Sequence, residues 1–195
     1  EIASCLVGSE MCIRDRSTTP APAIQNFLPS EEGFFLWGRA FAIGAVVYED
    51  GVEVKTFYAR CPIEGKVDTW VEENVLPQMV DMVETHATYE QMLKAFAEFF
   101  LENKEDADII FHMGVPVEAR VIIDMHDKGY IGTWDGAYPW LDIAGCLKQS
   151  RLDCTSVDTY NADHGIKVPQ PEPGGTHNPL YDSRAAALCY MNLMK

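Results

Sequence analysis

The sequence has little positive charge and no long apolar segment, and each shortage excludes a class of protein. Its 15 Lys and Arg residues stand against 30 Asp and Glu residues, which gives a formal net charge of −15. An extended surface that follows a phosphate backbone needs many cations, so any contact with nucleic acid must be small and local. No apolar run approaches the roughly 20 residues of a membrane-spanning helix, so no membrane partner is predicted.

The cysteines lack the spacing of a metal site. Two of the six lie in the first 16 residues, and the other four are irregularly spaced (Cys61, Cys146, Cys154 and Cys189). No C-x-x-C pair occurs, which argues against a structural zinc site. Free thiols are typical of a reducing compartment, so the sequence predicts a cytoplasmic protein.

The N-terminal segment differs in character from the rest of the chain. Residues 4–16, S-C-L-V-G-S-E-M-C-I-R-D-R, resemble a translated sequencing-library adapter. A signal peptide fits less well, because Glu1 and Glu10 are acidic and no long apolar core follows. We therefore expect residues 1–22 to be a non-native or disordered leader and residues 23–195 to form one domain, as the chain length suggests.

Hydrophobic periodicity and turn residues predict strands and helices in a mixed order. In chain order they are a strand at 23–28, a hairpin at 40–48 and 52–59, helices at 67–77 and 88–103, a strand at 106–113, a helix from Pro116 to just before Gly129, a strand at 137–144, a surface loop at 161–176 and a helix at 179–194. This order predicts an α/β fold, in which an antiparallel hairpin and parallel strands form one mixed sheet flanked by helices.

The motif H-N-P-L-Y-D at 177–182 carries the clearest chemistry. It places His177 in a loop and Asp182 in the first turn of the last predicted helix. A histidine can accept a proton from water near neutral pH, and a carboxylate is a suitable ligand for a divalent metal. The pair therefore suits a metal-dependent phosphodiesterase. The alternative is an exposed loop histidine and an acid that the helix dipole favours.

Three sequence blocks, taken in order, carry a family resemblance. They are G-R-A-F-A-I-G-A-V-V-Y-E-D-G at 38–51, A-D-I-I-F-H-M-G-V-P-V-E-A-R at 107–120 and H-N-P-L-Y-D-S-R at 177–184. They resemble the exonuclease blocks of the histidine-type DEDD (DEDDh) 3′–5′ exonucleases, a branch that includes proofreading exonucleases and oligoribonucleases. The resemblance implies a ribonuclease H-like fold, two Mg²⁺ or Mn²⁺ ions, and stepwise hydrolysis from the 3′ end of single-stranded or short DNA or RNA. A homodimer stays open as an alternative to a monomer.

The resemblance also implies roles for individual residues. His177 matches the general base of the family, and Asp182 matches its last metal-binding aspartate. In the middle block Glu118 is the carboxylate nearest to the aspartate of the family, and the alternative is an ordinary acid in the first turn of a helix. Trp37 and Arg39 are candidates for binding the terminal base and a phosphate. Their alternatives are core packing for Trp37 and a salt bridge for Arg39.

The first block departs from the family, which has D-x-E at the end of its first strand. Here the corresponding stretch is F-L-P-S-E-E-G at 27–33, and the expected positions fall near Leu28 and Ser30. Glu31 and Glu32 are close but out of register, and a shift by one residue turns a strand side chain to the other face. Either the sequence is damaged upstream, or the chain is a variant that uses Glu31 or Glu32 as a metal ligand or has lost activity.

Two other functions compete with a nuclease. The missing D-x-E favours a catalytically degenerate ribonuclease H-like module that binds a partner protein or a nucleotide. A metal-dependent nucleotide hydrolase unrelated to exonucleases is the third candidate.

Overall fold

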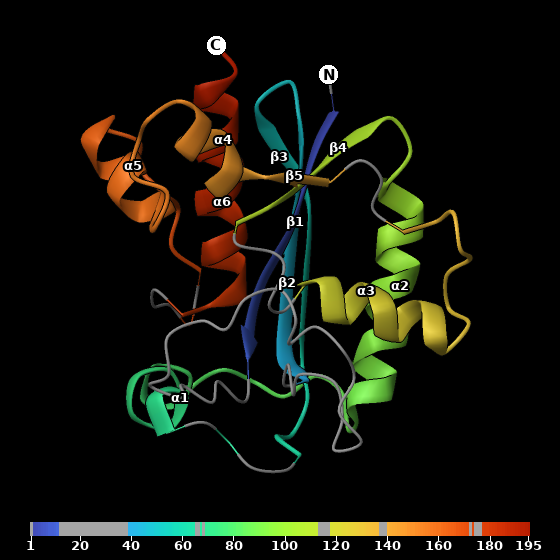
Figure 1. Cartoon of the computed structure of the whole chain (residues 1–195). Helices are drawn as coiled ribbons and strands as arrows, with labels where there is room; N and C mark the ends of the chain where they lie inside the picture. Colours follow the sequence, from blue (N-terminus) through green and yellow to red (C-terminus); the bar gives the residue numbers. More distant parts are fainter. Residues whose placement is uncertain are drawn as a thin grey trace, which may run out of the picture.

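A mixed five-stranded sheet forms the centre of the protein, with helices on both of its faces (Figure 1). The computed structural model describes residues 2–11 (backbone only), 39–64, 67, 69–112, 118–136, 140–171, 173 and 177–195. The strand order is β3-β2-β1-β4-β5. Its members are β1 (Ile2–Met11), β2 (Ala40–Glu49), β3 (Val52–Arg60), β4 (Ala107–Phe111) and β5 (Trp140–Asp142). β3, β2 and β1 pair antiparallel, whereas β1, β4 and β5 pair parallel, which confirms the predicted mixed α/β sheet.

The central strand β1 lies within the stretch that the sequence predicts as a leader. It pairs along β2 from Ile2 opposite Glu49 to Met11 opposite Ala40, and its first residues also pair with β4. The first strand expected at 23–28 and the expected boundary at residue 22 lie outside the described residues, so the division into leader and domain stays a prediction.

Most of the predicted helices are confirmed, with small changes at their ends. The helices are α1 (Thr69–Asn74), the 3₁₀ turn η2 (Leu76–Gln78), α2 (Tyr89–Asn103), α3 (Glu118–Asp127), α4 (Ile143–Gln149), α5 (Val157–Asp163) and α6 (Pro179–Leu193). α2 begins as predicted, because the Thr88 hydroxyl accepts a hydrogen bond from the Gln91 N–H at 3.2 Å. α3 ends before Gly129, whose φ of +71° suits glycine after a helix.

The helices α4 and α5 were not predicted, and α5 shows that the loop predicted to begin at residue 161 was placed too early. Each helix has only seven residues. Their starts do carry a local signal, because Asp142 accepts from the Ala144 N–H at 2.9 Å and Ser156 accepts from the Thr159 N–H at 3.3 Å. Two turns are too short to establish a helical hydrophobic period, so only the caps mark these helices.

Each face of the sheet carries its own apolar core. In Figure 1, α2 and α3 lie on one side of the sheet, and α4, α5 and α6 lie on the other. Strand β4 supplies both cores by alternation, because Ile109 and Phe111 pack toward α2 and α3 while Ile110 packs with α6. Strand β2 is buried along almost its whole length. Burial on both faces explains why its sequence is one continuous apolar run.

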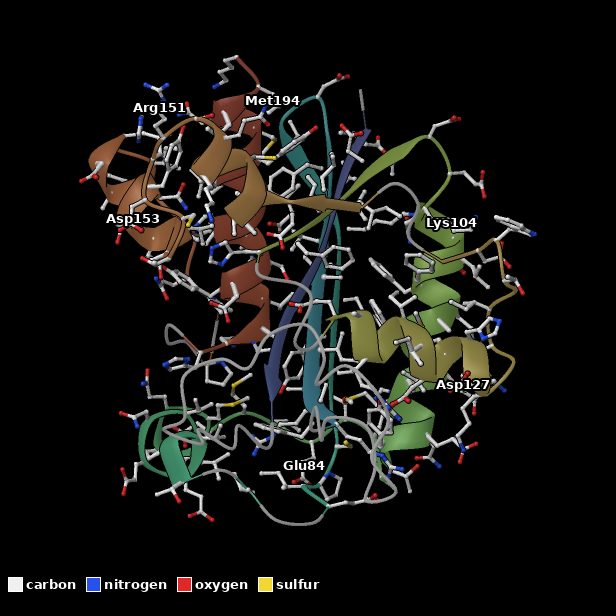
Figure 2. All side chains as sticks on the ribbon, viewed as in Figure 1. Glu84, Lys104, Asp127, Arg151, Asp153 and Met194 are labelled. Carbon is white, nitrogen blue, oxygen red and sulfur yellow. The ribbon has the colours of Figure 1, made fainter. Side chains whose placement is uncertain are left out.

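The charged side chains lie mostly at the periphery. Figure 2 shows exposed residues such as Glu84, Asp127, Arg151 and Asp153 around the outside of the fold. The four cysteines outside the N-terminal segment are free thiols, as expected. Among the described residues, no helix combines the length and the apolar character needed to cross a bilayer.

Candidate functional site

The start of α6 positions both residues of the H-N-P-L-Y-D motif. Asn178 is the N-cap, and its side-chain oxygen accepts from the Leu180 N–H at 2.9 Å. Its amide group also donates to the Pro173 carbonyl at 2.8 Å, which ties the preceding loop to the cap. His177 therefore immediately precedes the N-cap and Asp182 lies in the first turn, as predicted, and both residues are half-buried.

A close approach between backbones holds this helix start against the sheet. A Cβ atom on Gly44 of β2 would lie 2.5 Å from the Pro179 carbonyl oxygen and 2.6 Å from the Leu180 nitrogen. The fully buried Ser183 hydroxyl lies 3.0 Å from the Gly44 carbonyl and 2.8 Å from the Pro179 carbonyl. Only glycine permits this contact, and an isolated glycine inside a strand pattern is the signal that could have predicted it.

The same contact locates the first strand of the sheet relative to α6. Gly8 of β1 is the register partner of Gly44, and Glu10 is the partner of Ala42. The β1–β2 ladder then ends at Met11 and Ala40. The carboxyl-terminal half of β1 and the first turn of α6 are thus brought together through Gly44.

Glu118 begins α3 and is only 5% exposed. The strand β4 ends at Phe111, next to β1 in the parallel part of the sheet, and α3 is the next element along the chain. A carboxylate is rarely buried to this extent unless it has polar partners or a metal. Glu118 is therefore an acid in the first turn of α3, as its alternative states, and its side chain is buried, so its role as a metal ligand stays a prediction.

Two further polar side chains, His112 and Asp142, lie at the carboxyl ends of the parallel strands β4 and β5 and contact the protein backbone. His112 follows β4, and its Nε2 lies 3.3 Å from the Cys154 carbonyl oxygen. Burial lowers the pKa of His112, against the opposing influence of Asp142 and Asp158, so neutral imidazole is favoured. Asp142 ends β5 and caps α4.

The sequence did not single out Tyr181, which lies beside Asp182 in the first turn of α6. Its hydroxyl donates to an Asp158 carboxylate oxygen at 2.8 Å. Burial, followed by the Asp158 hydrogen bond, raises the pKa of Tyr181 to about 12, so the phenol stays protonated. This contact ties α5 to the start of α6, and no local motif signals it because the partners are 23 residues apart.

The remaining predicted residues fall into two groups. Glu31, Glu32 and Trp37 lie outside the described residues. Arg39 forms an exposed salt bridge with Glu64 at 3.7 Å, and its guanidinium also lies 5.5 Å from the Tyr89 ring centroid. Within the described part of the chain, no three His, Cys, Asp or Glu residues are grouped so that they could hold a metal ion.

Arg184, at the end of the last sequence block, is engaged in a structural ion pair. Its Nε and Nη2 atoms donate to the two carboxylate oxygens of Glu53 at 2.8 and 2.7 Å. Both side chains are largely buried, with 14% and 25% exposure. Such a two-point contact is among the stronger ion pairs, and it joins α6 to the edge strand β3.

Replacing Glu53 by Gln is expected to lower the free energy of unfolding by about 1–3 kcal/mol at neutral pH. The Arg184 hydrogen bond lowers the pKa of Glu53 below its ordinary 4.5, although burial opposes the change. A lowered folded-state pKa stabilises the fold fully above the unfolded-state pKa, and the stabilisation is lost as pH falls through the folded-state value.

Urea unfolding of the Glu53→Gln variant and the unmodified chain checks this expectation. The difference in their free energies of unfolding should be largest near pH 7 and should decrease as the pH falls below about 4.5. The exposed Glu98→Gln change is a matched control and should have little effect at either pH. A difference that is independent of pH would contradict the assignment of this ion pair as the cause.

Comparisons with known proteins agree with an exonuclease-like arrangement at the level of the fold. The sequence matches no family model, and no curated protein matches it either. A solved structure that describes the 3′-end-specific recognition of a histone mRNA stem-loop by a 3′-exonuclease is similar to this chain, with a TM-score of 0.60. The similarity covers 99% of this chain and 81% of that one at 11% sequence identity. At this identity it shows the fold alone, and that fold is 3′-exonuclease-like.

Proposed function

We propose that this protein is a metal-dependent 3′–5′ exonuclease of the histidine-type DEDD class, with a ribonuclease H-like fold, that acts on single-stranded or short DNA or RNA. The observation that carries the proposal is the start of α6, where His177 and Asp182 lie at a helix end held against β2 at Gly44. The distant similarity to the fold of a 3′-exonuclease supports it. A cytoplasmic location and either a monomer or a homodimer are part of the same proposal.

In this proposal, two of the described carboxylates would supply part of a metal site. Asp182 and Glu118 would hold Mg²⁺ or Mn²⁺, because hard carboxylate oxygens suit these ions. Glu31 or Glu32, the acids nearest to the expected D-x-E positions of the first block, would complete the ligand set. When bound, two such ions would neutralise charge on the phosphate and on the departing oxygen.

His177 supplies the acid–base chemistry in this proposal. It immediately precedes the N-cap of α6 and is half-buried. A histidine with an ordinary pKa near 6.5 is half neutral at that pH and can take a proton from the attacking water. The hydrogen bonds of Asn178 to both sides of the helix start hold the backbone that carries this ring.

A second function is favoured by the composition of the first block. A protein with this fold but without the D-x-E carboxylates would bind a nucleotide or a partner protein without hydrolysing a phosphodiester bond. The two functions differ in one observable, which is release of nucleotides.

The test is incubation of a short 5′-labelled single-stranded oligonucleotide with the purified protein and Mn²⁺. We expect slow release of mononucleotides from the 3′ end, reduced about 100-fold or more by His177→Ala and by Asp182→Asn. The exposed changes His126→Ala and Asp163→Asn remove the same groups elsewhere and should leave release unchanged. Absence of release from the unmodified chain contradicts the exonuclease function and favours the binding module.

A further inference from the structure

Two arginines of this acidic chain contact one tyrosine, directly or through a shared carboxylate. Arg39 lies with its guanidinium 5.5 Å from the centroid of the Tyr89 ring. Arg120 reaches the same tyrosine through a shared carboxylate: its Nη2 lies 2.7 Å from Asp124 Oδ1, and the Tyr89 hydroxyl donates to Asp124 Oδ2 at 2.7 Å. We refer to Arg39, Tyr89, Arg120 and Asp124 as the arginine cluster.

The arginine cluster is built around a buried acid. Asp124 is 8% exposed, and Tyr89 is 7% exposed. The two guanidinium side chains, in contrast, keep 62% and 42% exposure for Arg39 and Arg120 respectively. Asp124 therefore holds the Arg120 guanidinium through Nη2, and the Arg120 Nε is buried, while both arginine side chains keep a large exposed part. A planar guanidinium held in this way can form two hydrogen bonds to a phosphate without first losing its own mobility.

The electrostatics of Tyr89 agree with the proximity of both cations. Burial is the largest cause of the raised pKa of Tyr89, and the hydrogen bond to Asp124 raises it further. Arg120 and Arg39 both act in the opposite direction, as positive charges close to a phenol do. Of the two acids that pair with these cations, Asp124 is buried, whereas Glu64 meets Arg39 only at 3.7 Å on an exposed surface. The pairing with Glu64 is weak and easily exchanged for another anion.

The arginine cluster lies near the carboxyl end of β1 and at the first turn of α3. Arg39 directly precedes Ala40, the partner of Met11 at the carboxyl end of β1. Arg120 lies in the first turn of α3, two residues after Glu118. Arg39 thus lies at the carboxyl end of β1, and Tyr89 and Asp124 connect it to Arg120 in the first turn of α3. The net charge of −15 repels a phosphate, so a local pair of cations would favour phosphate binding at this position.

We propose that Arg39 and Arg120 form a clamp for a phosphate of a bound nucleic-acid strand, away from the bond that is cut. The proposal rests on the proposed exonuclease function for its ligand. In it, Tyr89 and Asp124 are positioning residues that hold the two guanidiniums, and neither touches the substrate. The clamp binds the backbone and does not read the base, so it suits a nuclease that removes nucleotides of any sequence.

The test measures binding separately from hydrolysis. A short 5′-fluorescein oligothymidylate is titrated with protein in EDTA, and anisotropy is followed across about 50 to 200 mM salt. Arg39→Gln and Arg120→Gln should each weaken binding several-fold, and the slope of log K against log [salt] should become less steep by about 0.7 for each arginine that no longer binds a phosphate. Arg120→Lys keeps the charge but loses the paired donors of the planar guanidinium. Its salt dependence should therefore equal that of the unmodified chain, and its affinity should lie between those of the unmodified chain and Arg120→Gln.

Controls distinguish a clamp from a purely structural role. Arg151→Gln removes an exposed arginine on the α4–α5 side (Figure 2) and should change neither affinity nor slope. Urea midpoints show whether each variant is folded. If hydrolysis is measured as well, the two cluster variants should raise KM and leave kcat nearly unchanged, because the contact is uniform in ground and transition states.

The outcomes separate this inference from the function on which it rests. Folded cluster variants that bind like the unmodified chain or like Arg151→Gln overturn the clamp, even if the protein hydrolyses DNA. Absence of oligonucleotide binding by the unmodified chain also overturns it. Salt-dependent binding that weakens in the cluster variants, without any hydrolysis in Mn²⁺, supports the clamp and contradicts the exonuclease function.

Discussion

A Gly8→Asp variant is expected to release nucleotides from a 3′ end about 100-fold faster than the unmodified chain, since one added metal ligand can contribute several kcal/mol to the transition state. The change creates D-S-E at residues 8–10, because Glu10 already stands two residues further on. This is the D-x-E pattern that the family resemblance places at the end of the first strand. Among the described residues, β1 lies between β2 and β4, in the position of that strand.

The register of β1 explains why position 8 is chosen. Gly8 is paired with Gly44, and Glu10 is paired with Ala42. Directly paired positions of an antiparallel ladder share one face of the sheet, and at Gly44 that face meets Pro179 at the start of α6. A carboxylate at position 8 would thus lie on the face of the sheet that contacts the start of α6, close to the helical turn that contains Asp182.

The activity assay in Mn²⁺ measures this effect, and three variants test its cause. Gly8→Asn has nearly the same shape without the charge and should give no gain. Adding Asp182→Asn to Gly8→Asp should abolish the gain, because both carboxylates act on the same ions. The Leu28→Asp/Ser30→Glu variant restores D-x-E at the position expected from sequence. A gain from that variant, with none from Gly8→Asp, would show that residues 23–30 supply the first strand of the active protein.

The sequence predicted those parts of the fold that are determined locally. The hairpin of β2 and β3 follows from an apolar run, a turn at Asp50 and Gly51 with positive φ, and an alternating strand. The helix α2 follows from its cap at Thr88 and from apolar residues on one face. In the site, His177 and Asp182 were found because a short stretch of sequence defines both the loop and the first helical turn.

The parts that were missed depend on partners far apart in the chain. The particular partner of Arg184 could not be predicted, because Glu53 lies 131 residues away in the chain. Arg120 was overlooked for a similar reason, because its partner Asp124 is shared with Tyr89, and these two residues are 35 positions apart. Strand β1 has neither a clear alternation nor a uniform apolar run, so only its pairing with β2 and β4 identifies it as a strand.

Replacing Gly44 by Ala is expected to lower the free energy of unfolding by about 3 kcal/mol, near the upper end for overpacking a buried site. The added Cβ would lie 2.5 Å from the Pro179 carbonyl oxygen and 2.6 Å from the Leu180 nitrogen. Both are backbone atoms, which cannot move aside by changing a rotamer. Either β2 or the first turn of α6 must shift, and the Ser183 contacts to the Gly44 and Pro179 carbonyls must stretch with it.

Gly145 of α4 provides the matched control, because a Cβ added there would have no neighbour within 4 Å. Alanine is the better helix former, so Gly145→Ala should stabilise the protein by up to about 1 kcal/mol in the same urea titration. If the free energy of unfolding falls in Gly44→Ala and rises in Gly145→Ala, the destabilisation at Gly44 results from the close approach of α6 and not from glycine replacement in general. Because the same contact holds His177 and Asp182 against the sheet, Gly44→Ala should also reduce nucleotide release at temperatures where the variant remains folded. Equal stability of the Gly44→Ala variant and the unmodified chain would mean that α6 does not begin against β2, and the proposed site would lose its geometric basis.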